Sequence, residues 1–416
     1  MKPNLQLTCS LCGKTYTPNA AAYTCPACNG NLDVVYDYAA LRKTFLDALH
    51  PQAEPSLWRY LPLLPVGDPG GEHTPLRAAG WTRMFSLPRL ADALGLNTLL
   101  IKDESTNPTA SFKDRASAVV VARAREIGAA TIVTASTGNA GAALAGMAAA
   151  VGQHAVIFAP KSAPPAKVAQ LLIFGAQVIL VDGNYDSASA LALEAAREFG
   201  WYCRNTAYNP FTTEGKKTAA LEIWEQVRAL RLQPKQPINL FVSVGDGNII
   251  SGIHKGFKDL AALGLLDDIG GMPRIYGVQA EGSAAISNAY AQNSETIVPV
   301  SAKTLADSIA VDLPADGVRA VRAARETGGA YVTVSDAEIL QAIAELGPQG
   351  IFAEPAGAAS LAGLRKALRE GLNPQAPVIL LNTGSGLKDV RAASQAVPSA
   401  PVIEPSLSAL KTLLSR

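Results

Sequence analysis

Lys113 is the residue of this chain whose surroundings most clearly indicate chemistry. It lies in "TNPTASFKDRASAVV", after Phe112 and before Asp114, at the predicted start of a helix. The positive end of the helix dipole and the apolar neighbour both disfavour a charged amine, so the pKa of Lys113 should be lowered. A neutral amine can form a Schiff base with an aldehyde cofactor. The alternative is a solvated lysine paired with Asp114 or a nearby glutamate.

The loop "ASTGNAG", from Ala135 to Gly141, carries groups that could bind an anion. The hydroxyls of Ser136 and Thr137 and several free backbone N–H groups would meet at the start of a helix, which favours negative charge. An ordinary helix cap with glycines for a tight turn is the alternative.

Two further loops lie at the predicted ends of strands. In "SVGDGNIISG", Gly245 and Gly247 would let the backbone approach a phosphate at a helix start. The spacing matches neither the nicotinamide-dinucleotide fingerprint nor a P-loop. In "NTGSGLKD", Thr383 would end the last core strand, where simple turn chemistry could also explain it. Phosphate cradles without a nucleotide motif, together with a neutral lysine, indicate pyridoxal phosphate.

Four of the five cysteines form two pairs near the N-terminus. Cys9 and Cys12 make "CSLC", and Cys25 and Cys28 make "CPAC". Two such knuckles would close a tetrahedral structural zinc site, and the metal would supply folding energy to so short a segment. Two disulfides or a redox pair are the competing interpretations, which suit a chain without a secretion signal less well. Cys203, in "WYCRNT", is expected to be a buried thiol.

Composition limits the partners of the protein. Among 416 residues, 48% are hydrophobic, and 36 basic against 35 acidic residues give a net charge of +1. This balance excludes the basic stripe of a nucleic-acid binder. The apolar stretch 140–160 is predicted to be a buried helix and strand rather than a membrane span. We therefore expect a soluble, cytoplasmic protein whose partner is a small molecule.

Short apolar runs alternate with helical patterns from about Leu99 onward. Continuous apolar runs are typical of parallel strands covered on both faces, so the chain is predicted to be an α/β protein with ligands at the carboxyl ends of its strands. The predicted strands are 98–104, 131–136, 154–160, 177–183, 201–206, 238–245, 274–281 and 376–384. The predicted helices are 111–128, 138–152, 167–176, 187–200, 212–230, 248–264 and 352–371.

The predicted organisation has two α/β domains after a small module. Residues 37–71 contain prolines and aromatics without periodicity and are expected to form an extended surface arm. The predicted segments are a zinc-ribbon-like module (1–36), the arm and the start of the large domain (37–105), a smaller mobile α/β domain (106–205), the large cofactor domain (206–400) and a C-terminal tail or helix (401–416).

Together these motifs make the chain resemble the fold-type II pyridoxal-phosphate enzymes, and among them the threonine synthases. The resemblance runs from about Thr74 to Asp389. The motifs that carry it are "HTPL", "NPTASFKDR", "ASTGNAG", "DGNYD", "NPFTTEGKKTAALEI", "VGDGNIISGIHKGF", "FAEPAGAASLAGL" and "NTGSGLKD".

The resemblance implies roles for individual residues. Lys113 would carry the cofactor and then move protons as base and acid. Asn139 would hydrogen-bond the 3′-oxygen of the cofactor, and Thr383 would face its pyridine nitrogen. Ser136 and Thr137 would receive the carboxylate or phosphate of the substrate. The cofactor phosphate would lie against Gly245, Asp246, Gly247, Asn248 and Ile249.

The resemblance also implies a reaction, the conversion of O-phospho-L-homoserine and water to L-threonine and phosphate, carried out by a homodimer. Two substrate-side positions depart from the family. Thr212 in "NPFTTEG" replaces an arginine that helps to hold phosphate, and Lys216 or Lys217 could substitute for it. Ala110 stands where the family often has glycine, and the segment 306–317 also differs.

Other functions remain open at this stage. A threonine or serine dehydratase and a β-replacement enzyme of the cysteate synthase kind would use the same fold. A zinc-ribbon binding module with an inactive body is a third possibility, although it predicts a damaged cofactor site and the chain retains the expected residues. A zinc-dependent catalyst is disfavoured because four thiolates leave no open coordination position.

Overall fold

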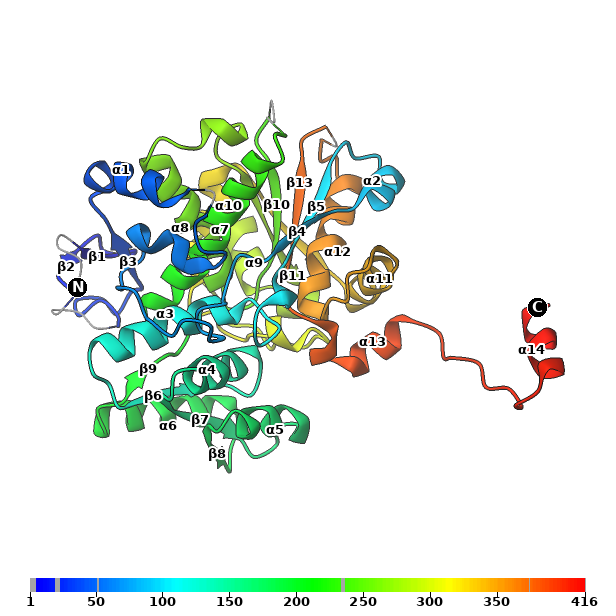
Figure 1. Ribbon diagram of the computed structural model, residues 1–416, viewed down its shortest axis with the longest axis horizontal. Helices are drawn as coiled ribbons and strands as arrows, with labels where there is room; N and C mark the ends of the chain where they lie inside the picture. The colour runs from blue at the N-terminus through cyan, green and yellow to red at the C-terminus, as the bar shows by residue number, and fades with distance from the viewer. Residues whose placement is uncertain (1–4, 19–22, 51, 233–235, 374, 416) are drawn as a thin grey trace.

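The computed structural model describes residues 5–18, 23–50, 52–232, 236–373 and 375–415, arranged around three sheets (Figure 1). Two of the sheets consist mainly of parallel strands with helices on both faces, so the α/β class predicted from the sequence is confirmed. The predicted domain boundaries stay a prediction. No helix of the described chain is long and apolar enough to cross a membrane.

The larger sheet has six strands in the order β12-β11-β10-β13-β5-β4, and only the edge pair β4–β5 is antiparallel. Leu240 and Val242 of one strand pack in one core and Phe241 in the opposite core, because successive side chains of a strand point to opposite faces. The strands are β4 (Arg83–Ser86), β5 (Leu99–Asp103), β10 (Asn239–Ser243), β11 (Arg274–Ala280), β12 (Tyr331–Val334) and β13 (Val378–Asn382).

Helices cover both faces of this sheet. One face carries α7 (Phe211–Ala229), α8 (Asn248–Ala262), α9 (Ala285–Ala291) and α10 (Gly317–Thr327). The other face carries α2 (Pro88–Leu94), α11 (Asp336–Leu346) and α12 (Pro355–Arg369).

The smaller sheet has four parallel strands in the order β8-β7-β6-β9. The strands are β6 (Thr131–Ala135), β7 (His154–Pro160), β8 (Gln177–Val181) and β9 (Tyr202–Cys203). The helices are α3 (Lys113–Glu126), α4 (Asn139–Ala149), α5 (Pro165–Ile173) and α6 (Tyr185–Glu198). Helix α3 packs on both α4 and α7, so it joins the small sheet to the large one.

The third sheet is a small antiparallel module at the flank of the molecule (Figure 1). Strands β1 (Gln6–Cys9), β2 (Thr15–Tyr16) and β3 (Leu32–Val35) pair in the order β2-β1-β3. Its core holds few apolar side chains besides the cysteines, among them Leu7 and Val34. So small a core needs a cross-link or a metal.

The segment 37–71 is not the exposed arm that the sequence suggested. It contains α1 (Tyr38–Ala48) and the 3₁₀ helix η1 (Leu57–Leu63), with Trp58 and Tyr60 buried. The indole Nε1 of Trp58 donates to the carbonyl of Leu76, 3.0 Å away. The aromatics therefore anchor the segment in the core, and one of its prolines, Pro62, lies inside η1. Residue 51 lies outside the described residues.

The sequence analysis assigned no helix or strand between residues 285 and 346, where the structure has α9, α10, β12 and α11. The remaining short 3₁₀ turns are η2 (Glu104–Thr106), η3 (Asp267–Ile269), η4 (Glu281–Ser283), η5 (Asp307–Ile309), η6 (Gly347–Gln349) and η7 (Gly386–Lys388). After α13 (Val390–Ala396), an extended segment carries α14 (Leu407–Leu414) away from the body (Figure 1).

Candidate active site

Lys113 begins α3 and is tied to the end of β13. The N–H of Phe112 donates to the carbonyl of Thr383 at 2.9 Å, and the N–H of Ser385 donates to the carbonyl of Ala110 at 3.1 Å. These bonds place the first turn of α3 beside the carboxyl end of a central strand, which is where ligands bind in parallel sheets.

A buried ionic cluster fixes the same helix against α7. The guanidinium of Arg115 donates to Glu104 and Glu222 at 2.7 Å, and Lys102 donates to Glu222 at the same distance. Burial alone would raise the pKa of Glu222, but the two cations hold it at about 2. Arg115 follows Lys113 by two residues, so this cluster helps to set the position of the lysine.

The Lys113 side chain is half-buried and, within the described residues, makes no hydrogen bond or ion pair. Burial lowers the pKa of its amine. Glu354 and Asp246 oppose this shift, and the guanidinium of Arg204 adds to it. The direction agrees with the sequence prediction, although burial contributes more than the dipole that was invoked. A partnerless amine with a lowered pKa is suited to covalent attachment.

The loop between β6 and α4 presents free donors. A Cβ at Gly141 would lie 2.2 Å from the carbonyl oxygen of Ser136, so only glycine allows this tight turn. In the part of the chain that the structure describes, the hydroxyls of Ser136 and Thr137 have no hydrogen-bond partner. The amide of Asn139 donates to both carboxylate oxygens of Glu354, at 2.9 and 3.0 Å.

Glu354 is a site residue that sequence reasoning did not assign. It is the N-cap residue of α12, lies beside Gly384, and is nearly fully buried. Burial raises the pKa of its carboxyl, while the amide of Asn139 and the charge of Lys113 oppose that rise. The signal for it in the sequence is an acid directly before Pro355 at a helix start, in "FAEPAGAASLAGL".

The glycine-rich loop joins β10 to α8. Gly247 has φ +89°, and a Cβ there would lie 2.7 Å from the carbonyl of Asp316. A Cβ at Gly245 would lie 2.7 Å from the Cα of Ile309. From Gly245 to Ile249, no backbone N–H has a hydrogen-bond partner within the described chain. Such a cradle of free donors at a helix start suits a phosphate.

Three neighbouring residues of α7 differ in what they contact. The amine of Lys216 donates to Asn248 Oδ1 at 2.5 Å, beside the glycine-rich loop. Burial and the charge of Lys113 push the pKa of Lys216 well below its usual value. Lys217 instead pairs with Asp259 at 2.8 Å in a separate cluster, so it does not replace the missing family arginine. The Thr212 hydroxyl donates to the carbonyl of Asn209.

A buried polar chain connects the N-terminal module with this loop. Arg319 donates to Asp33 of the module and to Asp316, in both cases at 2.6 Å. Asp316 accepts from the amide of Asn248 at 2.7 Å, and Asn248 accepts from Lys216. The sequence did not indicate this connection.

Thr383 and Asp246 complete the predicted set. The Thr383 hydroxyl is buried and has no hydrogen-bond partner among the residues that the structure describes. Asp246 accepts a hydrogen bond from the N–H of Ala315 at 2.7 Å. Burial raises the pKa of the Asp246 carboxyl, which the Ala315 bond and the charge of Lys216 oppose.

Arg204 is a second residue that sequence reasoning missed, because "WYCRNT" was taken as an apolar strand. It directly follows β9, and its N–H donates to the carbonyl of Val133 on β6 at 2.8 Å. Its guanidinium is fully buried, and burial lowers its pKa to about 10.

A cleft of about 350 Å³ opens between the two parallel sheets. Loops and helix ends from both sides line it, so the carboxyl ends of the two sets of strands face a common space. The lining residues include Ala110, Thr137, Asn139, Gln170, Glu354 and Lys388.

These groups fit pyridoxal phosphate. The glycine-rich loop offers free N–H donors where no side chain could fit, and Lys113 offers an amine without a partner. Residues 76–384 match the family described as "Pyridoxal-phosphate dependent enzyme". The chain belongs to that family.

Relatives of this pyridoxal-phosphate-dependent enzyme include threonine synthases. That of Methanocaldococcus jannaschii is 37% identical over 410 residues, which cover 98% of each chain. That of Methanosarcina acetivorans is also 37% identical, over 97% of each chain.

Solved structures share the fold. The processed form of threonine deaminase isoform 2 from Solanum lycopersicum superposes with a TM-score of 0.67 at 22% identity, covering 89% of this chain and 96% of that one. Diaminopropionate ammonia lyase from Escherichia coli gives a TM-score of 0.65 at 21% identity, covering 95% and 97%.

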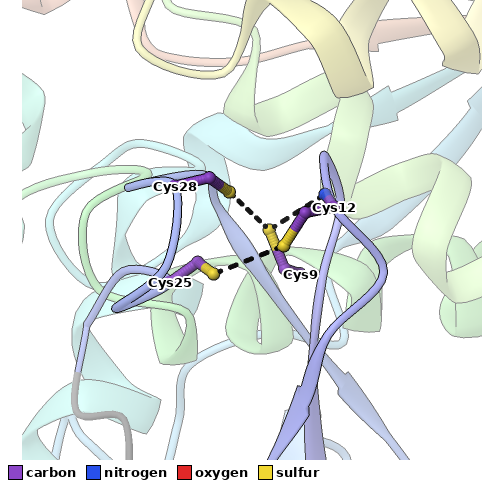
Figure 2. A group of neighbouring side chains, drawn as sticks. All are labelled: Cys9, Cys12, Cys25 and Cys28. Carbon is purple, nitrogen blue, oxygen red and sulfur yellow. Dashed lines mark hydrogen bonds between the residues drawn. The ribbon is translucent and has the colours of Figure 1, made fainter.

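The cysteines of this family member gather as the sequence predicted (Figure 2). The Sγ atoms of Cys9, Cys12, Cys25 and Cys28 all lie within 4.8 Å of one another, and all four are free thiols. The distances Cys9–Cys28 and Cys12–Cys25 are 3.4 and 3.6 Å. Zn–S bonds of about 2.3 Å in a tetrahedron imply sulfur–sulfur distances of about 3.8 Å, so the cluster is compatible with a zinc ribbon. Cys203 is a buried thiol, as expected.

Proposed function

We propose that this enzyme is a threonine synthase, which converts O-phospho-L-homoserine and water to L-threonine and phosphate. The 37% identity to a threonine synthase over 98% of both chains carries this proposal. The free amine, the two anion-binding loops and the cleft between the sheets supply the groups that such a reaction needs.

The cofactor would be held by Lys113, the Gly245–Ile249 backbone, Asn139 and Thr383. When bound, pyridoxal phosphate acidifies the C–H bonds of the attached amino acid by withdrawing electrons. The free hydroxyls of Ser136 and Thr137 would orient the substrate carboxylate toward the loop at the start of α4.

Lys113 Nζ is the group that would move protons in the reaction. Its lowered pKa leaves more of the amine neutral near neutral pH, so it can take the proton from Cα and later return one. Over the whole reaction, the Cγ–O bond to phosphate breaks, the hydroxyl of water is added at Cβ, and Cγ becomes a methyl group.

The first test is an assay of the purified holoenzyme with O-phospho-L-homoserine. We expect equal amounts of phosphate and threonine, and we expect Lys113→Ala to lose both the activity and the visible absorbance of the cofactor. Lys161→Ala, which changes an exposed lysine in the turn after β7, is the matched control and should keep both.

A dehydratase is the second candidate, favoured by Thr212 in place of the family arginine. A keto acid and ammonia from threonine or serine, without turnover of O-phospho-L-homoserine, would establish it and contradict the synthase. A β-replacement enzyme would instead need a second nucleophile in the assay.

We also propose that the four clustered cysteines hold a structural zinc ion and that the enzyme acts as a cytoplasmic homodimer. The sulfur–sulfur distances support the metal. The five free thiols support a reducing compartment. Sedimentation velocity would test the dimer, which a single monomeric species would contradict.

A further inference from the structure

Arg204 is the exception among the buried arginines of the described chain. The others each pair with a carboxylate: Arg59 with Glu225, Arg115 with Glu104 and Glu222, Arg123 with Glu126, and Arg319 with Asp33 and Asp316. Arg204 is fully buried and has no ion pair within that same part of the chain. An unpaired buried cation is costly, so folding alone does not explain its presence.

The guanidinium of Arg204 is only partly used. Its Nη1 donates to the hydroxyl of Thr206 at 2.7 Å, and its Nε donates to the hydroxyl of Ser117 at 3.2 Å. Its Nη2 is buried and has no hydrogen-bond partner. A guanidinium with one free, desolvated N–H donor can bind an additional acceptor.

The hydrogen bond to Ser117 places the guanidinium of Arg204 on the same side of α3 as the reacting lysine. Ser117 follows Lys113 by four residues on α3, so the two side chains share one face of the helix. The Arg204 charge contributes to the lowered pKa values of both Lys113 and Lys216. Arg204 also follows β9, which pairs with β6, the strand that leads into the Ser136 loop.

The site has more positive than negative charge. Three cations, Lys113, Lys216 and Arg204, meet there with two carboxylates, Asp246 and Glu354, whose pKa values burial raises. Lys216 is already bonded beside the glycine-rich loop, where the cofactor phosphate would lie. Two more cations line the cleft, but Lys167 pairs with Asp307 and Lys388 donates to Gln170. Apart from Lys113, Arg204 is therefore the cation of this site with a free donor for a second anion.

We propose that Arg204 binds the phosphate group of the substrate, with its free Nη2 donating to a phosphate oxygen. The inference rests on the proposed function, since a substrate without a phosphate would not need this arginine. It also gives Thr212 a simple explanation, because the phosphate-binding cation reaches the site from the end of β9 instead of from α7.

The test compares Arg204→Met and Arg204→Lys with the wild-type holoenzyme. We expect kcat/KM for O-phospho-L-homoserine to fall about 10- to 100-fold in Arg204→Met, as for the loss of one charged hydrogen bond. The kcat/KM of Arg204→Lys should lie between those of the wild type and Arg204→Met, because a lysine is charged but lacks the planar fork. Calorimetric titration with inorganic phosphate should show binding to wild type that is lost in Arg204→Met.

Thermal stability separates a ligand-binding arginine from a structural one. Removing an unpaired buried charge should leave the Tm of Arg204→Met unchanged or raised. Arg59→Met, which breaks a buried pair with Glu225, should lower the Tm and keep phosphate binding. A lower Tm or failed folding of Arg204→Met would overturn the proposal, as would unchanged kcat/KM and phosphate binding.

The same experiment distinguishes the two proposals. If the wild-type enzyme releases no threonine, the proposed function fails, and the phosphate titration still reports on Arg204 as an anion site. If the wild type makes threonine and Arg204→Met does so equally well, the proposed function stands and the role of Arg204 is refuted.

Discussion

At the scale of residues, the site depends on groups left without partners. Lys113, Ser136, Thr137 and Thr383 make no side-chain hydrogen bond among the described residues, while most polar side chains around them do. Thr383 is buried and the other three are half-buried, so their unpaired groups are available to a ligand at this site. The sequence could suggest Ser136, Thr137 and Thr383 because each follows a strand, and Lys113 because it begins a helix beside Phe112.

The lowered pKa of Lys113 leads to a prediction about cofactor loading. The amine must be neutral to react, so the fraction that reacts is lost as pH falls through its folded pKa. Because burial moves that pKa down, the rate at which the apoenzyme takes up pyridoxal phosphate should level off below the usual lysine pKa of about 10.4. Stopped-flow absorbance between pH 6 and 10 would measure it.

The comparison for this profile is Arg204→Met. Loss of the neighbouring positive charge should move the pKa of Lys113 upward, and the pH at which loading levels off should rise with it. A wild-type pKa at or above the usual lysine value, measured with the profile extended to pH 11, would contradict a lowered pKa.

At the scale of elements, the sequence predicted the fold best where glycines punctuate apolar runs. The strands and helices from β5 to α8 lie close to their expected bounds for this reason. It failed for η1, whose prolines suggested a surface arm. The burial of Tyr60 depends on α7, which is far away in the sequence. It also missed Arg204 and Glu354, whose role appears only when the two sheets face each other.

The Gly247 turn gives the first prediction at this scale. Gly247→Ala would combine left-handed backbone strain of about 1–2 kcal/mol with a close contact to Asp316. We expect affinity for pyridoxal phosphate to fall at least tenfold in an absorbance titration. Gly264→Ala is the control, since Gly264 has φ +66° but no atom near its Cβ. Equal effects of the two substitutions would argue against the cradle.

The ionic cluster that fixes α3 against α7 gives the second prediction at the scale of elements. Glu222→Gln would leave Arg115 and Lys102 partly uncompensated, and it should lower the free energy of unfolding by about 3–5 kcal/mol in urea. The folded pKa of Glu222 is about 2, below its usual 4.5, so its contribution is full above pH 4.5 and is lost as pH falls toward 2. A variant with wild-type acid sensitivity would show that other carboxylates dominate.

At the scale of the whole molecule, the N-terminal module and the site belong to one connected structure. The chain of polar contacts from Asp33 through Arg319, Asp316 and Asn248 ends at Lys216. A change in the module should therefore alter the glycine-rich loop. The spacing of the cysteines in the sequence did not predict this connection.

Metal removal tests this connection. We expect about one zinc per chain by mass spectrometry, and Cys12→Ser should lose the zinc, lower the Tm and weaken cofactor binding. Cys203→Ser, a buried thiol outside the cluster, should keep the metal. Wild-type protein that keeps its full Tm after its metal has been removed would refute the structural zinc.

The docking of the module has a consequence for synthesis on the ribosome. Arg319 and Arg322, which hold Asp33 and the carbonyl of Ser10, come 286 and 312 residues after the groups they bind. At about 5–20 residues per second, the module emerges roughly 15–60 s before its partners. During that interval the module is stabilised only by its few apolar side chains and by any metal that its thiols bind. The fraction of chains that fold with a complete active site would then depend on the metal available during translation, rather than on metal added afterwards.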